Sequence, residues 1–168
     1  MNLDAVLRTH AGRILDDTAA ELGQLRLHHY ESAGPEFTRT RLESLFELVV
    51  AAIEHRDVAA VTAYADAVAE ERFASGFDVS EVQHAFNLLE SVMWRTVVPL
   101  VRPDQLAESV GLIGTVFGIA KDELARRYVS LASQRRVTSL DLSALFSGVN
   151  SLAGVSDLDE AETSARAV

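Results

Sequence analysis

The stretch between Gly76 and Pro99 constrains the fold of this chain most strongly. Its apolar residues recur every three or four positions, which is the spacing of one face of an α-helix. They are Val79, Val82, Phe86, Leu89, Met93, Val97 and, just beyond, Leu100. Ala85, Leu88 and Val92 widen this face to about half the circumference, and neighbours cover so apolar a helix on more than one side. We therefore predict a central helix here.

Local signals mark both ends of the predicted central helix. Asp78 is expected to cap its first turn, and Glu81 to reach back and complete a capping box. Gly76 is expected to end the segment before it. Pro99 lies in the last turn, so the helix should end or kink there.

The polar side of this helix carries an unusual stripe. Gln83, Asn87, Glu90 and Trp94 fall together at 100° per residue. One interpretation is a solvated face with a single exposed tryptophan. The other is a contact surface, either a dimer seam or the lining of a small pocket, because Trp is enriched in both. We favour the contact surface, since a fully exposed Trp leaves a large apolar area in water.

The rest of the chain also has the pattern of helices. No segment alternates as a half-buried strand does, and Gly34-Pro35 reads as a break. Helices are expected over residues 3–22, within 24–32, from Thr38 or Thr40 to His55, from Asp57 to Phe73 or Ala74, and from Pro103 to Arg136. The prediction is an all-α bundle of about six helices with a long C-terminal helix.

The last predicted helix contains Gly111, Gly114 and Gly118 on one face. Each glycine costs up to about 1 kcal/mol of helix propensity relative to alanine. Either they are simply tolerated or mark a kink, or they mark a close helix crossing. We favour the crossing, with the central helix or a second subunit as the partner. At about 48 Å the helix is longer than a compact domain needs, so part of it is expected to project.

Residues 137–168 are expected to form a short helical segment followed by an acidic flexible tail. Leu140, Leu142, Leu145 and Phe146 form an apolar cluster in this otherwise polar region. An exposed apolar cluster of this kind is typical of a docking segment for a protein partner.

Composition excludes several functions. The 168 residues fit one domain, and the absence of cysteine rules out disulfides, thiolate metal sites and cysteine nucleophiles. The net charge of −10 argues against a nucleic-acid partner and against binding to an anionic membrane. No apolar run is long enough to span a bilayer. The first residues have neither a basic nor an apolar region, so we expect no signal peptide and a cytoplasmic protein.

One metal-binding motif needs consideration. Glu81-Val82-Gln83-His84 is a Glu-x-x-His, and two such motifs hold a metal pair in ferritin-like bundles. It occurs once here, because none of the other histidines has a glutamate three residues before it. They are His10, His28, His29 and His55. A capping role for Glu81 is the simpler interpretation, so we predict no metal site.

No enzyme is indicated by the remaining polar residues. Glu70-Glu71-Arg72 reads as a solvated helix face. There is no Ser/His/Asp arrangement, no glycine-rich phosphate loop and no H-E-x-x-H. His28, His29 or His84 as a haem ligand stays open as an alternative, because a single axial histidine has no spacing signature. The positive features favour a protein that binds.

The segments Glu70–Gln83 and Phe86–Glu90, together with Trp94, resemble a known family. It is the N-terminal domain of RsbR-type co-antagonists of the bacterial stressosome and of some actinobacterial sensor kinases. The likeness covers about residues 1–136, and its best part is the Gly-Phe-x-x-x-Glu-Val core. The resemblance implies a dimeric, globin-like sensor domain without haem, with no catalytic residues, whose long C-terminal helix leads to a STAS or kinase domain. Neither output domain occurs in this sequence.

We therefore expect a cytoplasmic sensory or regulatory module of stress or developmental signalling, with no cofactor. It should form a homodimer through the glycine-bearing helix and contact a kinase, an anti-sigma factor or a STAS-type protein. The alternatives are a sensor that binds haem or another small ligand, and a metal-dependent bundle enzyme.

Overall fold

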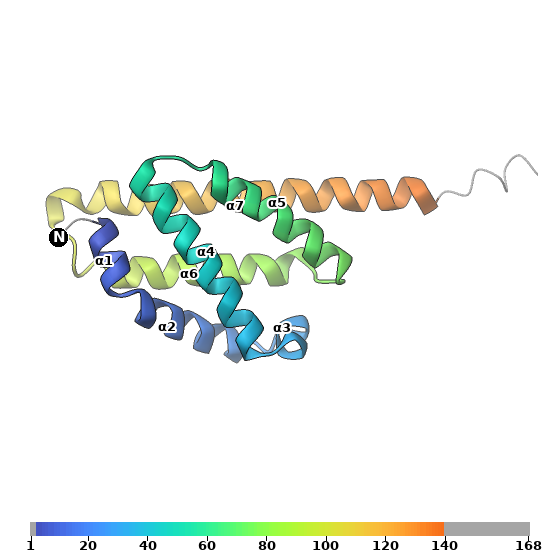
Figure 1. Cartoon of the computed structure of the whole chain (residues 1–168), viewed down its shortest axis with the longest axis horizontal. Helices are drawn as coiled ribbons and strands as arrows, with labels where there is room; N and C mark the ends of the chain where they lie inside the picture. Colours follow the sequence, from blue (N-terminus) through green and yellow to red (C-terminus); the bar gives the residue numbers. More distant parts are fainter. Residues whose placement is uncertain (1–2, 140–168) are drawn as a thin grey trace, which may run out of the picture. The chain divides into compact units, whose positions relative to one another are not determined.

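The computed structural model describes residues 3–139 (Figure 1). This part of the chain contains seven helices and no strand. The helices are α1 (Leu3–Thr9), α2 (Ala11–Gln24), α3 (His28–Ala33), α4 (Pro35–His55), α5 (Ala59–Ala74), α6 (Val79–Val97) and α7 (Pro103–Ser139). The prediction of an all-α, globin-like bundle with a long last helix is confirmed.

The single helix predicted over residues 3–22 is wrong, because the chain breaks at His10 into α1 and α2. The backbone of His10 has φ −103° and ψ 10°, well away from helical values. The predicted end at Leu22 is also two residues early, since α2 runs to Gln24. The chain turns after it at Arg26, whose φ of 49° is left-handed.

α4 begins at Pro35, earlier than the predicted Thr38 or Thr40. Proline fits the first turn of a helix, because its missing N–H has no partner there anyway. Gly34 before it has φ 89°, a conformation that glycine adopts without strain. The predicted end at His55 is confirmed.

The turn between α5 and α6 follows its sequence signals closely. Gly76 has φ 81°, and the Phe77 amide donates to the Arg72 carbonyl at 2.9 Å while the Gly76 amide donates to Phe73 at 3.2 Å. This is the Schellman pattern of helix termination. Asp78 then caps α6 as predicted, its Oδ1 accepting from the Ser80 amide at 2.8 Å.

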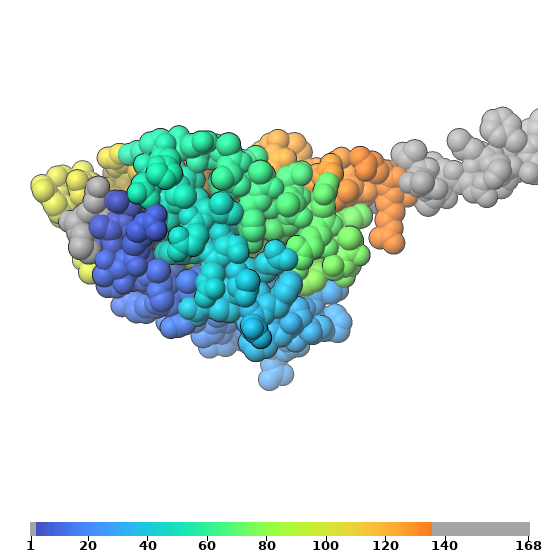
Figure 2. All heavy atoms as spheres, viewed as in Figure 1, coloured from blue at the N-terminus to red at the C-terminus, as the bar shows by residue number. Residues whose placement is uncertain are grey.

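α6 is central in the bundle, where it packs against α1, α2, α4 and α5. The buried part of its apolar face runs from Val82 to Val97, and Leu89 and Met93 are fully enclosed. Leu100, which was predicted on this face, lies beyond the helix and is exposed. The helix ends at Val97, just before Pro99, as predicted. In the space-filling view α4 and α5 cover the middle of the visible face, while α1 lies at its left and α2 at its lower left (Figure 2).

The chain divides into two compact units, Met1–Leu131 and Ala132–Val168. α7 crosses this division and is longer than predicted, ending at Ser139. In the first unit it buries Ile113, Phe117 and Leu124 completely. The predicted docking residues Leu140, Leu142, Leu145 and Phe146 lie outside the described residues.

Candidate functional site: a buried arginine and an exposed two-helix face

Arg72 is buried in the bundle, with 3% of its surface exposed. The interpretation of residues 70–72 as a solvated face is therefore wrong for this arginine. Arg72 continues the buried stripe of α5 formed by Val61, Ala65 and Val68, at steps of four, three and four. This spacing is visible in the sequence and would have placed Arg72 on the buried face of α5.

Two aromatic rings contact the Arg72 guanidinium. Its Cζ lies 4.3 Å from the ring centre of Phe37 in α4 and 4.8 Å from that of Phe77. The Schellman turn at Gly76 brings Phe77 back toward α5. A cation over an aromatic face is stabilised by the ring quadrupole, more strongly when water is excluded.

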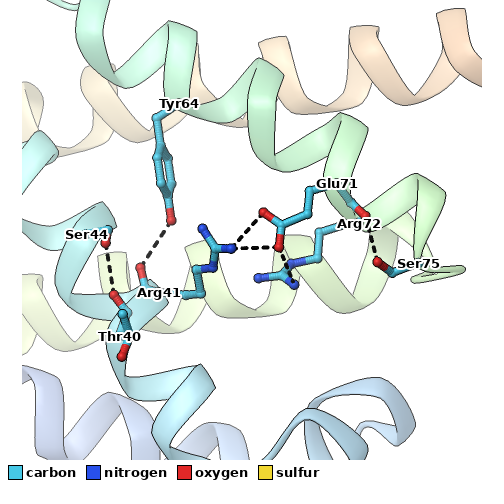
Figure 3. Close-up of polar contacts among 7 residues, drawn as sticks. All are labelled: Thr40, Arg41, Ser44, Tyr64, Glu71, Arg72 and Ser75. Carbon is cyan, nitrogen blue, oxygen red and sulfur yellow. Dashed lines mark hydrogen bonds and ion pairs between the residues drawn. The ribbon is translucent and has the colours of Figure 1, made fainter.

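The polar partners of Arg72 are incomplete (Figure 3). Arg41 donates to both carboxylate oxygens of Glu71, at 2.6 and 2.8 Å. Arg72 Nη1 lies 3.6 Å from the same carboxylate, too far for a hydrogen bond. The buried Nε of Arg72 has no hydrogen-bond partner. Two arginines thus share one carboxylate, which leaves an excess of positive charge.

A cavity of about 20 Å³ lies beside this group. Its polar lining comes from Arg41, Arg72, Tyr30, Thr38 and Tyr64, and its apolar lining from α4, α5 and α6. Burial raises the pKa of Tyr30 to about 12, and the positive charge of Arg72 opposes this rise. Burial likewise raises the pKa of Tyr64, whose hydroxyl donates to the Arg41 carbonyl at 3.2 Å. Both phenols are therefore neutral hydrogen-bonding groups at neutral pH.

The predicted stripe on α6 lies beside α7. Trp94 is 38% exposed, and its Cζ2 lies 3.5 Å from the position that a Cβ at Gly114 would occupy. Glu90 Oε1 is 3.8 Å from the same position. No atom lies within 4 Å of the corresponding positions at Gly111 and Gly118. Only Gly114 of the three glycines therefore faces the central helix closely.

Lys121 of α7 binds two residues of the stripe, and no pattern in the sequence predicted this contact. Its Nζ donates to Glu90 at 2.7 Å and to Asn87 at 3.0 Å. The structure thus brings Asn87, Glu90, Trp94 and Gly114 together, while Gln83 is half-buried one turn before Asn87. These contacts hold α6 and α7 side by side and leave the outer face of the pair open.

The two ends of the Glu-x-x-His motif bind different groups. The predicted capping box does not form. The Glu81 carboxylate lies 3.1 Å from His29 Nδ1 instead. His84 contacts the Ser80 carbonyl through Nδ1 at 2.6 Å. Within residues 3–139, no three His, Cys, Asp or Glu side chains gather as a metal would require. None of the helices described is both long enough and apolar enough to cross a bilayer.

The helix order defines an all-α, globin-like domain. The chain belongs to the family of the RsbT co-antagonist protein RsbRD N-terminal domain, whose model matches residues 4–131. This confirms the resemblance seen in the sequence. The family consists of stressosome-type sensor or regulatory domains and is regulatory, not catalytic. No curated protein and no solved structure matches the chain.

Proposed function

We propose that this chain is a cytoplasmic sensory module that forms a homodimer and passes its signal by contact with a regulatory protein. The family supports a regulatory role in stress signalling. The observation that carries the dimer is the exposed face shared by α6 and α7. We define this α6–α7 face by Trp94 of α6, Val98 immediately after α6, and Gly111, Gly118 and Ile119 of α7.

The α6–α7 face combines exposed apolar groups with missing side chains. Trp94, Val98 and Ile119 are 38%, 48% and 36% exposed. Val98 follows the last residue of α6 and lies one turn after Trp94, its amide donating to the Trp94 carbonyl at 2.9 Å. Gly111 and Gly118 lie seven apart on one side of α7, with open space where a side chain would stand.

A second copy fits this face better than an unrelated partner does. Two helices from each copy would make a four-helix arrangement around a twofold axis. The α6–α7 face of one copy would then pack against the same face of the other. The glycines let the helices of the two copies approach closely, and the distance between packed helices depends on the side chains at the contact. Trp94 would then be buried at the centre, where aromatic residues contribute most to association.

Sedimentation of two matched variants tests this dimer. Gly118→Glu places a charge in the proposed interface and should weaken dimerisation at least about tenfold, because burying an unpaired charge costs more than about 1.4 kcal/mol. Gly12→Glu is the control, since Gly12 lies in α2 and also has open space around it. The expected result is a dimer of 18.3 kDa chains for the wild type and Gly12→Glu, and monomers for Gly118→Glu. Equal sedimentation of both variants would show that the α6–α7 face is not the dimer interface.

For the output we propose that Leu140, Leu142, Leu145 and Phe146 dock a kinase, an anti-sigma factor or a STAS-type protein. The support is their apolar character within a polar stretch that directly follows α7. Leu145→Asp with Phe146→Asp should abolish capture of such a partner. Val155→Asp with Leu158→Asp is the control, because it adds the same charge further along. Capture that survives the first double substitution would argue against docking here.

The alternative of a sensor for a small ligand is favoured by the cavity at Arg72. The described contacts of the three candidate histidines do not support its haem form. His28 packs edge-on against His29, His29 pairs with Glu81, and His84 contacts the Ser80 carbonyl.

A further inference from the structure

We infer that the bundle contains a binding site for a small organic carboxylate with an apolar body, whose anionic end lies at Arg72. The inference deepens the proposed sensory function. The ligand's role as a signal rests on that proposal, while its binding is tested independently.

The charged end of the site is the cavity beside Arg72. Arg72 is 97% buried, and its Nε has no hydrogen-bond partner. A buried donor without a partner is costly, and a charged one more so, which makes an additional acceptor at this position favourable. At about 20 Å³ the cavity has room for one water-sized group, such as one carboxylate oxygen.

The charges around the cavity favour an anion over a neutral group. Arg41 and Arg72 both line it, and their shared carboxylate, Glu71, bonds Arg41. Because the two arginines share this one carboxylate, Arg41, Arg72 and Glu71 together carry one net positive charge at the cavity. The neutral phenol of Tyr30 is available as a further hydrogen-bond donor, whereas that of Tyr64 already donates to the Arg41 carbonyl. An arginine in a water-poor site is the preferred partner of a carboxylate.

The apolar end is a larger hollow between α2, α3 and α4. It has a volume of about 220 Å³ and is lined mainly by apolar atoms, among them those of Ala19, Leu22 and Leu27. Glu31 at its edge is exposed, and it is the one acidic residue in this lining. Tyr30 and Thr38 line both hollows, so the two adjoin at these side chains. In the proposed complex the aliphatic chain lies in the outer hollow, and the head group reaches Arg72 where the two hollows adjoin.

Calorimetric titration with three probes separates the two ends of the site. Octanoate has both an anionic head and an apolar body, octanol lacks the charge, and acetate lacks the body. We expect octanoate to bind at least about tenfold more tightly than either of the others. Octanol binding as tightly as octanoate would overturn the role of Arg72. Acetate binding as tightly would overturn the role of the outer hollow, and failure of octanoate to bind at millimolar concentration would overturn the site.

Two variants of the full chain complete the test. Arg72→Met keeps an unbranched side chain between the rings but removes the charge, so octanoate should lose at least about tenfold in affinity while octanol is unchanged. Ala19→Leu fills the outer hollow without touching Arg72 and should weaken both octanoate and octanol. Unchanged octanoate affinity in both variants would contradict the assignment. Gly118→Glu should bind octanoate as the wild type does, so a failure of the dimer and a failure of the ligand site are told apart.

Discussion

The guanidinium of Arg72 lies 4.8 Å from the ring centre of Phe77, on the far side of the turn at Gly76. The two residues are also joined through the backbone, because the Phe77 amide donates to the Arg72 carbonyl at 2.9 Å. One helix-ending turn therefore sets the position of an aromatic ring against the one fully buried arginine among the described residues. The stability of the turn and the environment of the arginine are expected to change together.

Gly76→Ala should destabilise the fold by about 1–2 kcal/mol, because φ of 81° is unfavourable for a residue with a Cβ. Steric contact is not the cause, since the nearest atom to the new Cβ is His29 Nε2 at 3.9 Å. Gly12→Ala is the matched control: its helical glycine has open space around it, so alanine should stabilise by up to about 1 kcal/mol. Urea denaturation measures both. Equal effects of the two substitutions would contradict the role of the turn.

Arg72→Ala should cost about 2–4 kcal/mol, because it removes a long side chain that packs between two rings. Arg72→Met should stay within about 1 kcal/mol of the wild type. It keeps much of the packing and removes a buried charge that is poorly paired, a replacement that is often neutral or favourable.

The same denaturation experiment compares these two variants. If Arg72→Met lost as much stability as Arg72→Ala, the fold would need the charge itself. The excess charge would then be a structural requirement and no longer an argument for a ligand.

Alkaline titration should reveal the burial of the tyrosines. Burial raises the pKa of all three, that of Tyr30 to about 12. The folded state holds Tyr30 as the neutral phenol, while the unfolded chain ionises it near 10. Its contribution to stability is therefore fully present below about pH 10 and is lost as the pH rises toward about 12. The loss is at most about 3 kcal/mol, at 1.36 kcal/mol per pKa unit.

Ultraviolet absorbance of the phenolate measures these titrations directly. The phenols should ionise at higher pH in the folded protein than in urea. Tyr30→Phe should remove part of the loss of stability at alkaline pH. Arg72→Met should raise the pKa of Tyr30 further, because the Arg72 charge opposes the rise. Tyrosines that titrate alike in folded and unfolded protein would show that they are not buried.

The sequence predicted those features that local interactions determine. The start of α6 at Asp78, its end before Pro99 and the stop at Gly76 depend on residues within a turn of each other. The break at His10 was missed because the apolar spacing continues through it without a proline. The burial of Arg72 depends on Phe37, which belongs to another helix and is far away in the sequence.

The same distinction between local and long-range interactions applies to the candidate sites. The stripe of Asn87, Glu90 and Trp94 was predicted, since one helix places these residues on one face. Its partner Lys121 was not, because the register between α6 and α7 is set by packing along both helices. Similarly, the contact of Glu81 with His29 replaced the expected capping box because α3 folds back near the start of α6.

The central claim is that the α6–α7 face joins two copies of this chain, and the fluorescence of its one tryptophan tests it most directly. Trp94 is partly exposed in the single chain, so an aqueous quencher should reach it in dilute protein. Quenching should decrease as the protein concentration rises through the dimer dissociation constant, while Gly118→Glu should remain fully quenched at every concentration. Quenching that is independent of concentration, in a protein that sediments as a dimer, would place the interface elsewhere and contradict the account.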